Sequence, residues 1–259
     1  MSQLLVSKKL VLILSLSMIS LLDYSLGISS KSLLARDPAS KLIAQSSPTS
    51  SPRISFKLPS RGAPVNTMAA ATRGNDNRPV AILPKTNLGL TASNSPVIFV
   101  YVPKNTSSFA QFRFRIADQE KKELYSSILP STQEEGILML KLPEKLNLSL
   151  GESYKWQFSL VEQNGKESRK FTTEGWIEKV PLDRNLEKAH SGKIESWTAI
   201  NIFAQEGIWQ DTLEKLALLH LDNPEDGQIQ REWTELLRSV GITETVAQSK
   251  IFPYIIQVE

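Results

Sequence analysis

Short apolar runs with a period of two residues dominate the middle of the chain. Phe112 and Phe114 alternate with Arg113 and Arg115, so one face of this segment is apolar and the other is polar. Such alternation is typical of a strand that has one face in a core and the other in water. Seven runs of this kind occur between turn residues, at 80–90, 97–102, 109–117, 123–129, 136–142, 153–162 and 167–179. Their close spacing predicts an immunoglobulin-like antiparallel β-sandwich over residues 80–181.

One of these runs carries a ladder of aromatic residues. Tyr154, Trp156 and Phe158 lie two residues apart and therefore share one face of the predicted strand. Gly151 precedes them in a turn, and the hydroxyl of Tyr154 could bond to the backbone just upstream, as in the tyrosine corner of Greek-key sandwiches. We therefore expect the ladder to form part of the core and not to stack on a ligand.

Further along the chain the period of the apolar positions changes to 3.6 residues. Apolar residues at helical spacing begin at Trp209 and at Trp233, and a preceding helix is expected at 194–205. These three helices predict a small helical region over residues 182–247. The last two helices look like a tetratricopeptide hairpin. Because such a repeat needs stacked copies, a single hairpin would have to cover the sandwich or bind a partner. Residues 248–259 form an apolar tail that could dock as a strand.

The N-terminal part of the chain predicts export. Lys8 and Lys9 precede an apolar run at 10–22 that is too short to span a bilayer comfortably, so residues 1–27 are predicted to be a signal peptide, with a retained anchor as the alternative. Residues 28–79 are rich in Ser and Pro and poor in aromatic residues, which favours a disordered basic linker. We expect a periplasmic or extracellular protein with no membrane-spanning segment after cleavage.

The composition of the 259-residue chain excludes several kinds of catalytic and metal-binding site. Cysteine is absent, and His190 and His220 are the only histidines, so thiolate nucleophiles and cysteine metal sites are excluded. The chain contains no phosphate-binding glycine loop, serine-hydrolase elbow or zinc-protease motif. No dense basic run with interleaved aromatic residues occurs, so we expect no nucleic-acid partner. No catalytic, metal-binding or cofactor-binding residue is predicted, and whether the chain is an enzyme stays open, with a non-enzyme favoured. Asp222, Glu225 and Asp226 could bind a divalent cation through their oxygens, but their spacing does not follow that of an EF-hand, so they are interpreted as helix caps.

The strongest local candidate for a binding site lies in the last predicted strand. Glu174 and Trp176 flank Gly175, and a glycine inside a strand indicates a bulge or a close backbone approach. These side chains could form one wall of a shallow groove, and Tyr101 joins them as a further candidate for a glycan-binding face. The alternative is that the strand bends at Gly175 and that Trp176 packs between sandwich and helices.

Several stretches form a combination that is specific as a whole, although each is weak alone. They are Arg61-Gly62-Ala63-Pro64, Thr72-Arg73-Gly74, the segment 83–91, Tyr101-Val102-Pro103, Gly151-x-x-Tyr154-x-Trp156, Glu174-Gly175-Trp176-Ile177, the segment 206–211 and Glu232-Trp233-x-x-Leu236-Leu237. Together they resemble the cyanobacterial domain of unknown function numbered 928. The segment 65–71 departs from the family pattern, because it is less basic and contains less glycine. The resemblance implies a cyanobacterial, exported protein and supplies no catalytic residues.

Three functions remain open from the sequence. The first is a non-catalytic binding or assembly module at the cell envelope, whose partner would be an envelope protein or a polysaccharide. The second is a glycan-binding module or carbohydrate-active enzyme that uses Glu174, Trp176 and Tyr101. The third is a helical adaptor that docks a repeat protein through Trp197, Trp209 and Trp233, which would require those indoles to be exposed.

Overall fold

The computed structural model describes residues 53–60, 62–64, 78–104, 109–131, 134–164 and 167–255. The predicted signal peptide and most of the predicted linker lie outside the described residues. The sheets and the helices belong to one compact unit, which spans Ser51–Glu259.

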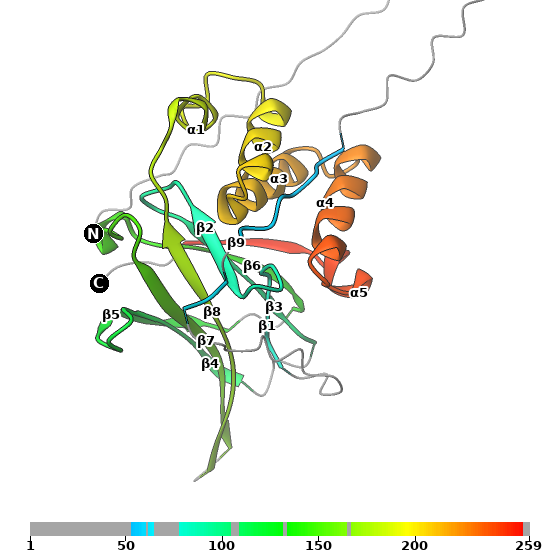
Figure 1. The fold of residues 1–259 in the computed structure, drawn as a ribbon. Helices are drawn as coiled ribbons and strands as arrows, with labels where there is room; N and C mark the ends of the chain where they lie inside the picture. The colour runs from blue at the N-terminus through cyan, green and yellow to red at the C-terminus, as the bar shows by residue number, and fades with distance from the viewer. Residues whose placement is uncertain are drawn as a thin grey trace, which may run out of the picture. The chain divides into compact units, whose positions relative to one another are not determined.

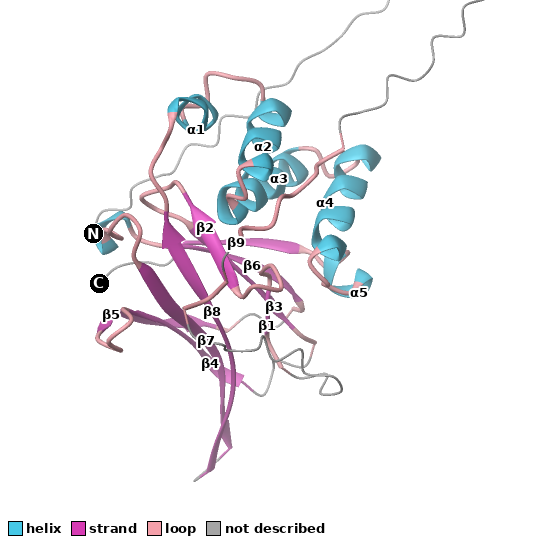
Figure 2. Cartoon of the chain, viewed as in Figure 1, coloured by secondary structure: helices cyan, strands magenta, loops and turns pink. Residues whose placement is uncertain are grey.

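Two β-sheets form the sandwich (Figures 1 and 2). The first, sheet A, has the order β1 (Val80–Ala81), β3 (Val97–Val102), β6 (Gly136–Lys141) and β9 (Ile251–Ile255). The second, sheet B, has the order β2 (Leu88–Thr91), β8 (Glu167–Lys179), β7 (Ser153–Asn164), β4 (Phe109–Ala117) and β5 (Glu123–Pro130). A 3₁₀-helix, η2 (Glu144–Leu146), precedes β7. The predicted strands therefore exist, but the run at 80–90 supplies β1 to one sheet and β2 to the other.

The sheets are mixed, so the prediction of an all-antiparallel sandwich is wrong at two edges. Strand β2 runs parallel to β8, and β9 runs parallel to β6. A parallel neighbour needs a long crossover between the two strands. The helical region provides that crossover for β9, and most of the sandwich lies between β2 and β8 in the sequence. The protein is thus an α/β fold of two mixed sheets followed by helices.

The inward faces of the two sheets form the main core. The aromatic ladder belongs to it, because Trp156 and Phe158 are fully buried and Tyr154 is nearly so. The hydroxyl oxygen of Tyr154 accepts a hydrogen bond from the backbone N–H of Ser149 at 3.0 Å. This contact confirms the predicted tyrosine corner, and it pins the turn before β7 to the strand that follows.

Gly175 permits the closest approach inside this core. A Cβ atom at this position would lie 2.7 Å from Cζ2 of Trp156 and closer still to Cδ1 of Leu83. We expect Gly175→Ala to lower the free energy of unfolding by about 1–3 kcal/mol, because the buried neighbours have to move. Gly227→Ala is the matched control, since its nearest neighbour would be the terminal guanidinium of Arg231 at 3.5 Å. Urea denaturation of both variants checks the prediction, and equal stabilities would contradict it.

Five helices follow the sandwich where three were predicted. They are α1 (Arg184–His190), α2 (Ser196–Gln205), α3 (Trp209–Asp222), α4 (Gly227–Ser239) and α5 (Glu244–Ala247). Asp226 caps α4 by accepting hydrogen bonds from the N–H groups of Gln228 and Ile229, which confirms its interpretation as a cap. In the described part of the chain, none of the helices has the length and apolar character needed to cross a membrane.

The helices pack on the sandwich through two groups of apolar side chains. Trp209 and Trp233 join the main core, and each indole N–H donates to a backbone carbonyl, of Ile82 and Ala247 respectively. A second, smaller core lies against Trp176 on β8 and includes side chains from β2, α1 and α2. The helices therefore cover one end of the outer face of sheet B and leave the strands β4 and β5 uncovered by any described helix (Figure 2).

Candidate ligand-binding face

The outer face of sheet B, away from the sandwich core, carries a continuous polar surface on β4, β7 and β8. Strand register places Arg115 opposite Gln157, and Gln157 opposite Glu174 on the next strand. In the neighbouring row, Arg113 lies opposite Ser159. These residues follow from the alternation of the strands, since their sequence neighbours Phe112, Phe114, Trp156 and Phe158 all point into the core.

A chain of polar contacts fixes one row of this surface. Arg115 Nε donates to Gln157 Oε1 at 2.6 Å, and Gln157 Nε2 donates to Glu174 Oε2 at 2.6 Å. Lys155 Nζ lies 2.7 Å from Glu174 Oε1. Partial burial alone would raise the pKa of Glu174, but the hydrogen bonds from Lys155 and Gln157 outweigh it and lower that pKa. Glu174 is therefore an ionised carboxylate that holds its neighbours in place, which does not suit a general acid.

Beside this row lies an open trough with a volume of about 1180 Å³. Its lining comes from β4, β5, β7, β8 and β9 and consists of Arg113, Phe114, Arg115, Glu123, Tyr125, Ser126, Ser127, Ile128, Leu129, Pro130, Ser159, Lys170 and Pro253. Among the residues that the structure describes, no ion pair within 4 Å engages Arg113, Arg115 or Lys170. Glu123 is the acid of the lining and accepts a hydrogen bond from Ser126. The trough therefore presents an excess of positive charge together with hydroxyl groups.

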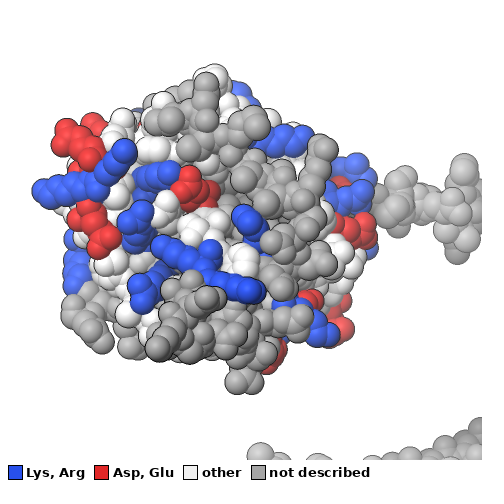
Figure 3. Space-filling view, turned by 90° about the horizontal axis from the view of Figure 1, so that it is seen from below, with Lys and Arg blue, Asp and Glu red and all other residues white. Residues whose placement is uncertain are grey.

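Positive charge also gathers on the side of the molecule where the lower ends of β7 and β8 lie in Figure 1. In Figure 3, which views that side from below, Lys and Arg side chains run across the middle of the face, and most Asp and Glu side chains lie nearer its edges. Such a field attracts anions over a distance set by the Debye length, about 8 Å at physiological ionic strength.

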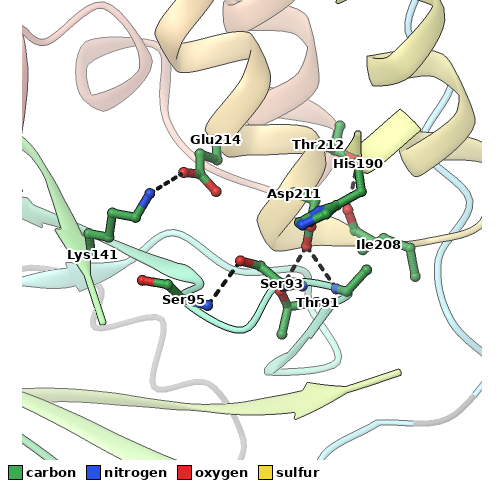
Figure 4. A network of polar contacts seen from close by, with 10 residues as sticks. Thr91, Ser93, Ser95, Lys141, His190, Ile208, Asp211, Thr212 and Glu214 are labelled. Atoms are coloured by element: carbon green, nitrogen blue, oxygen red, sulfur yellow. Dashed lines mark hydrogen bonds and ion pairs between the residues drawn. The ribbon is translucent and has the colours of Figure 1, made fainter. Parts of the chain in front are cut away.

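A second polar cluster joins α3 to the loop after β2 (Figure 4). Asp211 Oδ2 accepts hydrogen bonds from the hydroxyl of Thr91 at 2.8 Å and from the N–H of Ala92 at 3.1 Å, and Oδ1 lies 3.9 Å from His190 Nδ1. Burial raises the pKa of Asp211 to about 6, although these two hydrogen bonds favour its ionised form. The cluster clamps α1 and the β2–β3 loop to α3.

One turn along α3, Glu214 extends this cluster. Its carboxylate lies 3.6 Å from Lys141 Nζ on β6. Burial raises the pKa of Glu214, while Lys141 opposes the rise and the charge of Asp211 adds to it. Among the described residues, no group of three or more His, Cys, Asp or Glu side chains could hold a metal ion. The hydrogen bonds of Asp211 and the ion pair of Glu214 with Lys141 are thus structural contacts that hold the helices against the sheets.

Comparison with known protein families assigns the chain to one of them. A model of the family described as Domain of Unknown Function (DUF928) matches residues 58–251, well over half of the chain. The chain belongs to the DUF928 family. No curated protein matches it. The family resemblance seen in the sequence is thereby confirmed, and the match extends into β9.

The DUF928 fold separates the three residues predicted to form a groove. Glu174 lies half-exposed on the outer face of sheet B, next to the trough. Trp176 shares that face but is only 4% exposed, because α1 and α2 cover it. Tyr101 lies on β3 in the other sheet, opposite Ile137. The structure therefore does not bring the three side chains together, and Trp176 packs between sandwich and helices, as the alternative expected.

Sequence reasoning missed the three cations of the trough. Alternation along the chain predicts only that Arg113 and Arg115 face solvent, and the sequence around Lys170 predicts no role for that residue. Their proximity depends on pairing β4 with β7 and β7 with β8, which brings residues about 55 positions apart onto one surface. The one signal in the sequence was the Arg-x-Arg spacing on a strand whose other face is aromatic.

Proposed function

We propose that this DUF928 protein is a non-catalytic binding module of the cell envelope whose trough on sheet B binds an acidic polysaccharide. The observation that carries the proposal is the set of three cations, Arg113, Arg115 and Lys170, that line one open trough and form no ion pair within 4 Å in the described part of the chain. Export through the signal peptide and a periplasmic or extracellular location belong to the same proposal, as does a cyanobacterial source.

The arrangement suits a repeating anionic ligand. Arg113 and Arg115 lie two residues apart on the same face of β4, about 7 Å along the strand. Guanidinium groups bind carboxylate and sulfate oxygens through paired hydrogen bonds, and the serine hydroxyls of the lining can serve sugar hydroxyls. Because Arg115 is already held by Gln157, less conformational entropy is lost when it binds a ligand.

The chemistry on this face favours binding over catalysis. Glycoside hydrolysis requires one carboxyl group with a raised pKa beside a second carboxylate. The pKa of Glu174 is lowered, and its carboxylate is engaged by Lys155 and Gln157. The rival idea of a helical adaptor needs exposed indoles at Trp197, Trp209 and Trp233. It is disfavoured, because Trp209 and Trp233 are buried and Trp197 is half-buried. An immunoglobulin-like sandwich and a tetratricopeptide-like hairpin remain our proposals for the finer fold.

The test is affinity electrophoresis of the purified protein in gels that contain polygalacturonate, dextran sulfate or neutral dextran. We expect both acidic polymers to retard the protein and neutral dextran to leave it unretarded. The double variant Arg113→Ser and Lys170→Ser should weaken the retardation about fivefold or more, since two exposed ion pairs contribute up to about 1 kcal/mol each. Salt at about 0.5 M should abolish the retardation.

The matched control removes two cations elsewhere, through Lys145→Ser on η2 and Lys193→Ser in the loop after α1, both exposed. This variant has the same net charge as the trough variant. If both double variants lose retardation equally, net charge and not the trough is responsible, and the proposal fails.

A further inference from the structure

The segment 53–60, called the strap here, lies on the helices although it falls inside the predicted linker. It runs in extended conformation, with Ile54 and Phe56 half-buried against the main core and Ser55 and Lys57 exposed. This alternation is that of a β-strand whose one face rests on a surface. Figure 1 shows the strap in blue, passing between α3 and α4.

Main-chain hydrogen bonds attach the strap to two helices. The N–H of Ile54 donates to Glu232 Oε2 on α4 at 2.9 Å, and the N–H of Lys57 donates to the carbonyl of Ala204 on α2 at 3.0 Å. From α2, Gln205 Nε2 donates to the carbonyl of Ser55 at 3.2 Å. Bonds of this kind hold an extended peptide through its backbone, whatever its side chains.

One aromatic contact adds side-chain specificity. The ring of Phe56 meets the indole of Trp209 on α3 edge to face, with 4.9 Å between centroids. Such a pair contributes about 0.5–1.5 kcal/mol beyond the area it buries. An Ile-x-Phe spacing therefore matches the surface, with the isoleucine and the phenylalanine on the buried side.

The helical surface is shaped to receive this peptide. Glu232 is only 7% exposed, yet its carboxylate is directed at the strap and accepts the N–H of Ile54. Gly207, in the turn between α2 and α3, has φ +73°, and a Cβ there would lie 2.8 Å from the carbonyl oxygen of Lys57. The turn thus approaches the strap more closely than a larger residue would allow.

We infer that the surface formed by α2, α3 and α4 is a binding groove for an extended peptide with the Ile-x-Phe spacing, and that the strap of a second copy of this chain can replace the chain's own strap in it. The strap is the peptide seated on the groove, so the molecule certain to carry a matching segment is another copy. Exchange of an identical element between copies needs no new contacts, because each groove regains the ones it gave up. The inference is independent of the polysaccharide site.

The first experiment measures peptide binding to the full chain by fluorescence anisotropy. The probe is a labelled synthetic peptide of residues 51–60, and the proteins are the wild type and Phe56→Ala, whose own strap is weakened. The chain's own strap competes at an effective concentration of the order of millimolar, so the wild type should bind the peptide weakly. We expect Phe56→Ala to bind it at least tenfold more tightly, and a peptide with alanine at Phe56 to bind neither protein.

Two further variants keep the peptide-binding test conclusive if Phe56→Ala does not fold. Ile54→Ala weakens the strap with a smaller loss of contacts and serves if Phe56→Ala does not fold. Glu232→Ala, added to Phe56→Ala, removes the acceptor for the peptide backbone and should reduce binding. If Phe56→Ala and Ile54→Ala keep the wild-type circular dichroism spectrum and bind the peptide no more tightly than the wild type, the groove is overturned.

The second experiment tests the second copy as the occupant. Because the chain lacks cysteine, Ser60→Cys on the strap and Glu235→Cys on α4, both exposed, can each take a single dye. Mixing donor-labelled and acceptor-labelled populations should produce energy transfer between copies, and an excess of the peptide should suppress it. Peptide binding without such transfer at about 100 μM protein would overturn strap exchange.

Discussion

Trp209→Ala will lower the free energy of unfolding by about 3–5 kcal/mol, the range for a fully buried tryptophan replaced by alanine. The indole is fully buried between the helices and the sandwich, and its N–H donates to the carbonyl of Ile82 at 3.0 Å. The variant loses this bond, opens a cavity and removes the partner of the Phe56 ring. Urea denaturation followed by circular dichroism measures the loss.

Trp197→Ala is the matched control for this prediction. Trp197 lies on α2 and is half-buried, so its removal should cost clearly less, about 1–2 kcal/mol. If Trp209→Ala costs no more than Trp197→Ala, then Trp209 does not couple the helical region to the sandwich.

The stability of the protein should fall as the pH rises through about 6, because of Asp211. Burial raises the pKa of this carboxyl from its ordinary 3.8 to about 6, so the folded state binds its proton more tightly than the unfolded chain does. The resulting stabilisation is complete below about pH 3.8 and is lost as the pH rises through about 6. Its full size is about 3 kcal/mol, at about 1.4 kcal/mol for each pH interval between the two pKa values.

Comparison with Asp211→Asn isolates this effect. Asparagine keeps an oxygen that can accept from Thr91 and Ala92 but does not titrate, so the pH dependence between about 4 and 8 should become flatter. The neighbouring side chains of His190, Lys215 and Glu214 remain in both proteins. Asp222→Asn, on the exposed end of α3, is the control and should retain the wild-type slope. Parallel curves for the wild type and Asp211→Asn would contradict the prediction.

Alternation along the chain predicted which side chains point inward on each strand, and Tyr154 and Trp156 behave as expected. It could not predict strand direction, because a period of two residues is the same in parallel and antiparallel neighbours, and so the pairings of β2 and β9 were missed. Trp176 shows that alternation does not predict whether an outward-facing side chain is exposed to solvent. Periodicity places it on the outer face of sheet B, but whether that face meets water depends on helices further along the chain.

The candidate site was predicted less well than the fold, for a similar reason. Arg113, Arg115 and Lys170 form a surface only when three strands are paired in register. The strap was missed because its composition is that of a disordered segment and most of its bonds are made by the backbone. Residue types carry no signal for such bonds, whose partners become apparent only when the helices are in place.

The strap also determines how the protein would bear mechanical load. The bond from the Ile54 N–H to Glu232 lies nearest the N-terminal end of the strap, so a pull applied at Arg53 loads it before the other described contacts of the strap. The bond from Gln205 to the Ser55 carbonyl, the Phe56 ring on Trp209 and the bond from Lys57 to Ala204 would be loaded next, one after another. A force applied at Arg53 would therefore detach the strap one contact at a time before it reaches the strands of the sandwich.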